Sequence, residues 1–316
     1  MEYHAWRNQM KIIFPQNFLS TLADPTWSAI FANEIVAGNI AESLTQAIIS
    51  NYIKRFGRIR KVIPQSQTGF PDDRGSRVDI EVVTDDNEIV IYELQILHDP
   101  SLPKRNILAA SHRIFDSAAP GDSYRDLLKK IPKIILINIL CYNIRGDNAD
   151  IVQPTQMLFT KPPHTIADDT ITQFNVQLPR FITLIEEGRV DYKNALHCWL
   201  MLFWKSHELK KSPQEVLKMY PQLQEFADAN TGYGDFCQRY NLVAADRTTL
   251  KRYAMWLNEA LRHEGEIAGA VADAIAGKDA EIAGKDAEIA EKDTEIAGKD
   301  AEIADLKAQL KRFKDI

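Results

Sequence analysis

Residues 76–96 constrain the fold most, because they predict a β-hairpin that brings two acidic side chains together. Two runs rich in β-branched residues flank the turn-forming residues Asp85–Asn87. A three-residue loop centred on Asp86 pairs the strands so that Asp79 lies opposite Glu93. Directly opposed side chains have Cβ atoms roughly 4.5–5.5 Å apart, and like charges in that position weaken a sheet. The pair therefore indicates a divalent cation between the two carboxylates.

The same register divides the other side chains between two faces of the hairpin. Arg77 falls opposite Gln95, on the face of the carboxylates, and the alternate set of residues points the other way. This second face is apolar and is expected to rest on the core: Val78, Ile80, Val82, Val90, Tyr92, Leu94 and Ile96. An ordinary edge hairpin with a polar outer face fits the spacing equally well.

The charge of the chain is concentrated at its C-terminal end. The 316 residues carry a net charge of −6, and residues 263–316 alone hold 14 acidic and 8 basic side chains. The neutral remainder does not indicate bulk nucleic-acid binding, although a local basic groove remains compatible with it. Within the basic run 54–61, Lys54, Arg58 and Arg60 are candidates for gripping phosphates, and a solvated helix end is an equal alternative.

The chain shows no secretory leader and no apolar run long enough to cross a bilayer. Its three cysteines are widely spaced, which is typical of buried thiols in a reducing compartment and not of a disulfide frame or a zinc site. The sequence therefore predicts a cytoplasmic protein with no membrane partner.

The order of predicted elements indicates an α/β fold with a central mixed sheet flanked by helices. A helical stretch broken near Gly38 comes first, and further helices and a buried apolar strand follow the hairpin. The predicted helices cover 25–56, 106–118 and 124–130, and the predicted strands outside the hairpin cover 58–64, 134–140 and 170–178. Residues 179–262 show a helical pattern throughout.

A seven-residue repeat forms the C-terminal segment, with isoleucines at Ile275, Ile282, Ile289 and Ile296. Glutamates four residues before lysines support a helix, whereas the repeated glycines oppose it. Neither heptad register supplies two apolar seam positions, so a strong coiled coil is not expected. We predict a long solvated helix that self-associates into a homo-oligomer, with a disordered acidic tail as the alternative. The predicted divisions are 1–178, 179–262 and 263–316.

The hairpin and the strand after it carry a resemblance to a known family. The matching residues are Val78-Asp79-Ile80, Ile91-Tyr92-Glu93-Leu94-Gln95, Arg105 before a helix, and the run 133–139. Upstream, 24–34 is similar to the opening Asp-x-x-Phe-Lys-x-x-Phe segment of that family. The chain resembles the PD-(D/E)XK nuclease superfamily, and specifically the Rpn recombination-promoting nucleases, also described as PD-(D/E)XK nuclease family transposases.

The resemblance implies a restriction-endonuclease-like core that cleaves DNA with a divalent metal, Mg²⁺ or Mn²⁺. Asp79 and Glu93 would be metal ligands, with the carbonyl of Leu94 as a third. Gln95 stands where the superfamily most often has lysine, and its amide can orient a water but cannot act as a cation or a general acid.

The resemblance also implies a positive charge near the phosphate and an additional helical acid. Arg77 or Arg105 is the candidate for the charge. Glu34 and Glu42 are the candidates for the acid. The lysine that follows the aromatic residue in the family's opening segment is absent here, because Trp27 precedes Ser28.

Two functional hypotheses follow from these observations. The first is a Mg²⁺-dependent deoxyribonuclease that promotes recombination or acts like a transposase. The second is a nuclease fold with weakened chemistry, which binds DNA or protein and oligomerises through its C-terminal helix. Gln95 in the place of lysine is the feature that keeps the second hypothesis open.

Overall fold

The computed structural model describes most of the chain as two compact units. The first unit ends at Trp256 and the second begins at Leu257. The described residues are 20–54, 56–68, 76–96, 99–144, 150–158, 160–161 and 165–314. The three-part division predicted from the sequence stays a prediction.

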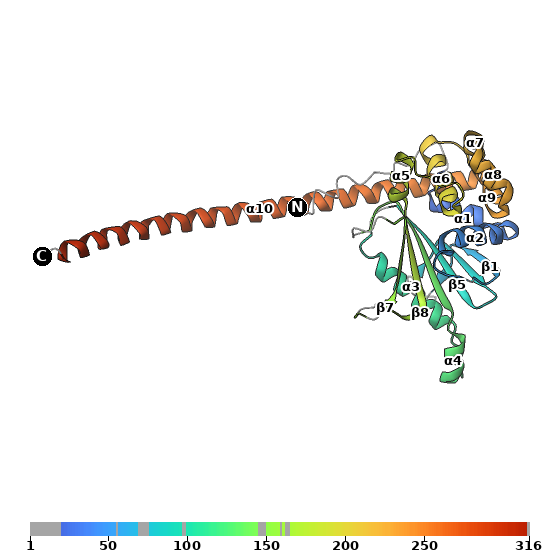
Figure 1. Cartoon of the computed structure of the whole chain (residues 1–316), viewed down its shortest axis with the longest axis horizontal. Helices are drawn as coiled ribbons and strands as arrows, with labels where there is room; N and C mark the ends of the chain where they lie inside the picture. The colour runs from blue at the N-terminus through green and yellow to red at the C-terminus, as the bar shows by residue number, and fades with distance from the viewer. Residues whose placement is uncertain are drawn as a thin grey trace. The chain divides into compact units, whose positions relative to one another are not determined.

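A mixed sheet lies at the centre of the first unit (Figure 1). In its described part, six strands follow the order β1-β4-β5-β6-β8-β7, with β6 parallel to both β5 and β8 and all other neighbours antiparallel. The strands are β1 (Ile59–Pro64), β4 (Ile80–Thr84), β5 (Glu88–Gln95), β6 (Lys133–Leu140), β7 (Val152–Leu158) and β8 (Ile166–Gln177). The short strands β2 (Gln67–Thr68) and β3 (Ser76–Arg77) form a separate pair. The predicted α/β core with a central mixed sheet is confirmed.

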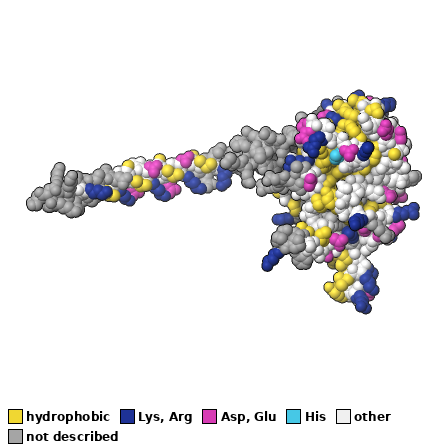
Figure 2. All heavy atoms as spheres, in the orientation of Figure 1, with side chains coloured by type: hydrophobic (Ala, Val, Ile, Leu, Met, Phe, Trp, Pro, Cys, Tyr) yellow, Lys and Arg dark blue, Asp and Glu magenta, His cyan; other side chains and the backbone are white. Residues whose placement is uncertain are grey.

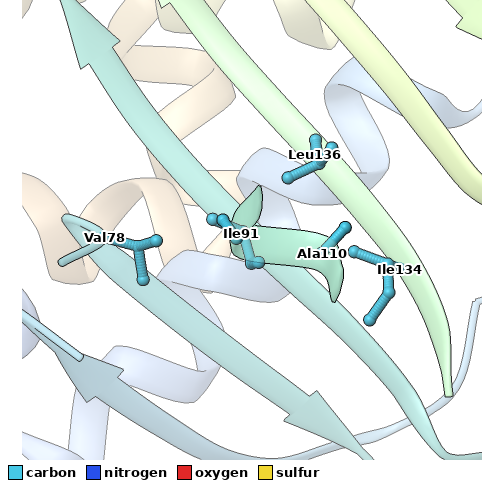
Figure 3. Close-up of a cluster of buried hydrophobic side chains, with 6 residues drawn as sticks. Val78, Ile91, Ala110, Ile134 and Leu136 are labelled. Carbon is cyan, nitrogen blue, oxygen red and sulfur yellow. The ribbon is translucent and has the colours of Figure 1, made fainter. Parts of the chain in front are cut away.

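Helices cover both faces of this sheet. Adjacent residues of β5 point to opposite faces: Tyr92 donates to the carbonyl of Ala41 and contacts the ring of Trp27, whereas Ile91 packs beneath α3 with Ala110 (Figure 3). Helices α1 and α2 therefore lie on one face and α3 on the other. The helices are α1 (Asp24–Phe31), α2 (Glu34–Ile49), α3 (Leu102–Asp116), α4 (Tyr124–Lys130), α5 (Leu178–Glu186), α6 (Ala195–Leu209), α7 (Pro213–Met219), α8 (Pro221–Ala229), α9 (Thr231–Ala245) and α10 (Arg247–Lys314).

Two elements differ from the sequence prediction for identifiable reasons. The first helical stretch breaks at Ala32 and Asn33, and Gly38 lies inside the continuous helix α2. The Asn33 side chain accepts a hydrogen bond from the Val36 N–H, so a capping contact starts the new helix there. Strand β7 is not predicted from the sequence because Pro154 interrupts its strand pattern. Proline is tolerated there because β7 is an edge strand.

The hairpin has the predicted register over four residue pairs, from Ile80 with Tyr92 to Val83 with Ile89. The predicted pairing of Arg77 with Gln95 is wrong, because Arg77 pairs with Gln67 in the separate short sheet. The chain leaves β5 at this point since the backbone before Ile80 bonds instead to the segment that follows β1.

The departure of the chain also moves Val78 to the other face of the sheet. The N–H of Val78 donates to the Ser66 carbonyl, and the Asp79 carbonyl accepts from the N–H of Gln65. Val78 consequently packs with Ile91 under α3 and not with the Ile80 set, which corrects its predicted place on the opposite face (Figure 3).

The helices after β8 enclose a second apolar core. Trp199 and Phe203 of α6 are fully buried, and their rings lie 5.4 Å apart. Both rings contact Phe236 of α9 at 5.4 Å, and Phe203 also meets Trp27 of α1. The helical region therefore packs directly on the helices that cover the sheet.

The repeat segment belongs to α10. Its isoleucines are about half exposed, at 56% for Ile282 and 57% for Ile289, and glutamate–lysine pairs such as Glu288–Lys292 at 2.7 Å run alongside. Figure 2 shows apolar, basic and acidic side chains alternating along the described part of the repeat. Self-association of this segment stays a prediction. None of the helices in the described ranges combines the length and apolar character needed to cross a bilayer.

Gly232→Ala is expected to destabilise the fold, because α9 approaches α2 at this position without room for a side chain. An added Cβ would lie 2.0 Å from the carbonyl oxygen of Asn39. We expect a loss of about 1–3 kcal/mol in the free energy of unfolding, as for other overpacked sites. The measurement is urea denaturation.

Gly38→Ala is the matched control, because Gly38 is also helical and has no atom within 4 Å of an added Cβ. That change should be neutral or stabilising by up to about 1 kcal/mol. Equal unfolding midpoints for the two variants would contradict the close helix contact.

Candidate active site

Asp79 and Glu93 lie side by side at the end of the hairpin and are held by reciprocal hydrogen bonds. The backbone N–H of Leu94 donates to Asp79 Oδ2 at 2.9 Å, and the backbone N–H of Asp79 donates to the Glu93 carboxylate. This exchange occurs where β4 has not yet begun, so the Asp79 carboxylate accepts the bond that a strand carbonyl would otherwise accept. The two acids are therefore close although they are not a ladder pair.

Glu93 is buried among polar partners. Gln95 donates from its amide to Glu93 Oε2 at 3.0 Å, and the guanidinium of Arg105 lies 3.4 Å from the same oxygen. Arg105 also binds Asp99 at 2.9 Å. Burial, and then the charge of Asp79, raises the pKa of Glu93 to about 8, while Arg105 acts in the opposite direction. Glu93 is thus held largely protonated at neutral pH unless a further positive charge arrives.

Asp24, at the start of α1, is the third acid of the cluster. Its Oδ1 is shielded from solvent and has no hydrogen-bond partner among the described residues, while its Oδ2 accepts a bond from the indole N–H of Trp256 at 3.3 Å. Desolvation, followed by the charges of Asp79 and Glu93, raises the pKa of Asp24 well above its usual value. Asp24 therefore interacts electrostatically with the other two acids.

Sequence reasoning missed Asp24 although it opens the segment that carries the family resemblance. The predicted candidates for the additional acid, Glu34 and Glu42, are both exposed on α2. An acid in front of Pro25 reads as an ordinary helix start, since proline is common in the first turn. Only the tertiary fold brings Asp24 to Asp79 and Glu93.

Buried amides hold α3 in place beside Glu93. Asn106, which is 2% exposed, donates to Asn138 at 3.2 Å and to Gln173 at 3.1 Å. Asn138 neighbours Glu93 in the parallel register of β5 and β6. Because buried polar side chains need specific partners, these bonds fix the position of α3 on the sheet. Arg105, the residue before Asn106, is thereby directed towards Glu93.

Glu81 shares the face of Glu93 but is engaged elsewhere. It forms a buried ion pair with Arg113 of α3, and Ser66 bonds both side chains. A buried carboxylate with two such partners has a structural role.

The predicted basic contacts are not gathered around the acids. Lys54, Arg58 and Arg60 are exposed. The Arg58 carbonyl accepts from the N–H of Asp85 in the hairpin turn, so this group lies at the opposite end of β4 from Asp79, roughly 17 Å away along the strand. The Arg77 side chain lies outside the described residues. Arg105 is the predicted cation that the fold brings to the carboxylates.

The donor set suits a hard divalent cation. Carboxylate oxygens are preferred ligands of Mg²⁺, and the shielded Oδ1 of Asp24 is a carboxylate oxygen with no hydrogen-bond donor among the described residues. In the described residues, however, no three His, Cys, Asp or Glu side chains are already arranged as a closed ligand set. Arg105 supplies the nearby positive charge in this arrangement.

The sheet and its helices fit the core of PD-(D/E)XK nucleases. The family model described as PD-(D/E)XK nuclease family transposase matches residues 23–253, and the chain belongs to this family. The resemblance inferred from the hairpin is confirmed. Membership indicates a nuclease or transposase-like function with DNA as the substrate class, and nucleases of this kind generally use divalent metals. No curated protein and no solved structure matches the chain at a significant level.

Glu93→Gln should remove part of the pH dependence of stability in the absence of metal. The folded-state pKa of about 8 exceeds the unfolded value, so the folded protein keeps a proton that the unfolded chain loses as the pH rises. Wild type should therefore lose stability relative to the variant between about pH 5 and 8, by at most about 1.4 kcal/mol per pH unit.

Urea denaturation with EDTA across that pH range measures the difference between the two proteins. Asp85→Asn in the exposed turn is the control, and its curve should run parallel to that of wild type. A parallel curve for Glu93→Gln as well would show that Glu93 is not held protonated.

Proposed function

We propose that the chain is a Mg²⁺-dependent DNA endonuclease with Asp79, Glu93 and the carbonyl of Leu94 as metal ligands. The observation that carries this proposal is the pair of hydrogen bonds in which the Leu94 backbone N–H donates to the Asp79 carboxylate and the Asp79 backbone N–H donates to the Glu93 carboxylate. It fixes two carboxylates and one peptide group at the end of a strand. Asp24, with one unpartnered oxygen, is proposed as the additional acid in place of Glu34 or Glu42.

The acids bind the cation and the remaining polar groups orient the substrate. When bound, a divalent cation neutralises charge developing on a phosphodiester and lowers the pKa of a coordinated water. The Gln95 amide N–H donates to Glu93, and the Gln95 carbonyl oxygen can accept a hydrogen bond from a water. Arg105, which is 47% exposed, can exchange its contact with Glu93 for a phosphate oxygen once the cation neutralises that carboxylate.

Asp79→Asn and Glu93→Gln are each expected to slow plasmid nicking by at least about a hundredfold. Loss of a metal ligand should cost more than loss of a supporting group, which typically costs 10–100-fold. The measurement is conversion of supercoiled plasmid with Mg²⁺ or Mn²⁺ and with EDTA, and Asp85→Asn should cut at the wild-type rate. Cleavage by Asp79→Asn at that rate would refute the site.

The second candidate function is a binding module with weakened chemistry, and the position of Gln95 favours it. Its side chain is neutral and already bonded to Glu93, so position 95 itself supplies no lysine-like charge to the acids. Binding of Mn²⁺ and DNA without cleavage by wild type would support this reading. A role in recombination or transposition is a further proposal that rests on the family.

Deletion of residues 266–316 is expected to convert an oligomer to a monomer. Isoleucines that recur every seven residues and remain about half exposed would be covered by a second copy of the repeat. Multi-angle light scattering of the full chain and the truncated chain gives the two masses. An unchanged mass per particle would assign the repeat to a spacer.

A further inference from the structure

Helix α10 contacts the acid cluster through its first turns. The indole N–H of Trp256 donates to Asp24 Oδ2 at 3.3 Å, while Oδ1 is left without a partner among the described residues. Trp256 is itself stacked on Tyr253, with ring centroids 5.8 Å apart and planes at 27°. Tyr253 is 2% exposed, so the stacked pair is anchored in the first compact unit.

The turn that presents Asp24 is held by the same helical region. The Tyr253 hydroxyl is hydrogen-bonded to the backbone of Ser20. Ser20 also bonds the His207 ring at 2.8 Å, and the Thr21 hydroxyl donates to the Phe203 carbonyl at 2.8 Å. Side chains and backbone of α6 and α10 therefore determine where Asp24 stands, whereas Asp79 and Glu93 are positioned by the sheet.

We propose that Trp256 is a positioning residue for Asp24 and that the start of α10 completes the cation site. The inference rests on the proposed function and adds an element to it. A carboxylate with one oxygen held by a donor keeps the other oxygen in a fixed direction, which is how supporting groups orient metal ligands. The donor lies just beyond the residues matched by the family model, 23–253, so this contact is a feature of this chain outside the matched part.

The state of the second Asp24 oxygen is consistent with this role. Oδ1 is shielded from solvent and has no hydrogen-bond partner among the described residues, and the Asp24 carboxylate interacts electrostatically with Asp79 and Glu93. A tryptophan that served only to fill space would not need its N–H against a carboxylate. Phenylalanine at position 256 retains an aromatic ring on Tyr253 and removes the N–H donor together with part of the indole bicycle.

The test measures Mn²⁺ affinity of the full chain by the loss of the free-ion signal in electron paramagnetic resonance. Trp256→Phe should weaken binding by roughly tenfold, as expected for loss of a group that orients a ligand. Trp199→Phe is the matched control, because its indole N–H donates to Ser43 at 3.2 Å within the helical core. That variant should lower the melting temperature and leave Mn²⁺ affinity unchanged.

A double-mutant cycle with Asp24→Asn separates positioning from general destabilisation. If Trp256 acts through Asp24, Trp256→Phe should have no further effect on Mn²⁺ affinity in the Asp24→Asn background. The same tenfold loss in both backgrounds would overturn the proposal. Should Trp256→Phe fail to fold, Trp256→Leu replaces it, since leucine fills apolar space and has no side-chain donor.

The outcomes also separate this inference from the proposed function. Wild type that binds Mn²⁺ and nicks plasmid, with Trp256→Phe indistinguishable from it, refutes the positioning role alone. Wild type that binds no Mn²⁺ refutes the proposed function and this inference with it. Weakened binding that depends on Asp24 supports the positioning role whether or not DNA is cut.

Discussion

The candidate site depends on the bend at Asp79, where the chain stops pairing with β5 and its carboxylate takes over as the acceptor for Leu94. A regular strand would have continued the ladder and left the Asp79 side chain on its surface. The bend instead lets two peptide groups bond two carboxylates in reciprocal fashion. Backbone N–H donors favour the charged form of a carboxylate, which partly offsets the cost of placing two acids together.

The backbone donors do not remove the repulsion between the two acids, and the pKa of Glu93 shows this. Burial and mutual repulsion still raise the pKa of Glu93 to about 8, even with Arg105 nearby. Arg105 is too exposed to contribute much stability as an ion pair. The arrangement is thus electrostatically unsatisfied and would gain most from a compact divalent charge, which no surface arginine can replace.

Periodic features of the sequence predicted the framework of the fold, because strand alternation and a continuous apolar run depend on local pattern. The hairpin register and β6 followed from such patterns. Features set by packing between distant segments did not. Gly38 predicts a break although its helix continues, and strand alternation predicts the wrong face for Val78 because residues 65–66 redirect the chain. Strand β7, which contains Pro154, is not predicted for the same reason. Only the arrangement of the neighbouring strands shows that β7 lies at the edge of the sheet, where proline is tolerated.

Asp24 shows most clearly why a candidate acid cluster is harder to infer than a fold. Its two partners are brought together by the hairpin and the bend at Asp79, whereas Asp24 enters from a helix whose position is set by α6 and α10. The sheet therefore supplies only part of the acid cluster. The sequence presents the helical region as a separate segment, but this region packs against the turn that carries Asp24. Substitutions in the helical region that shift the turn at residues 20–24 would therefore displace Asp24 before they affect the other acids.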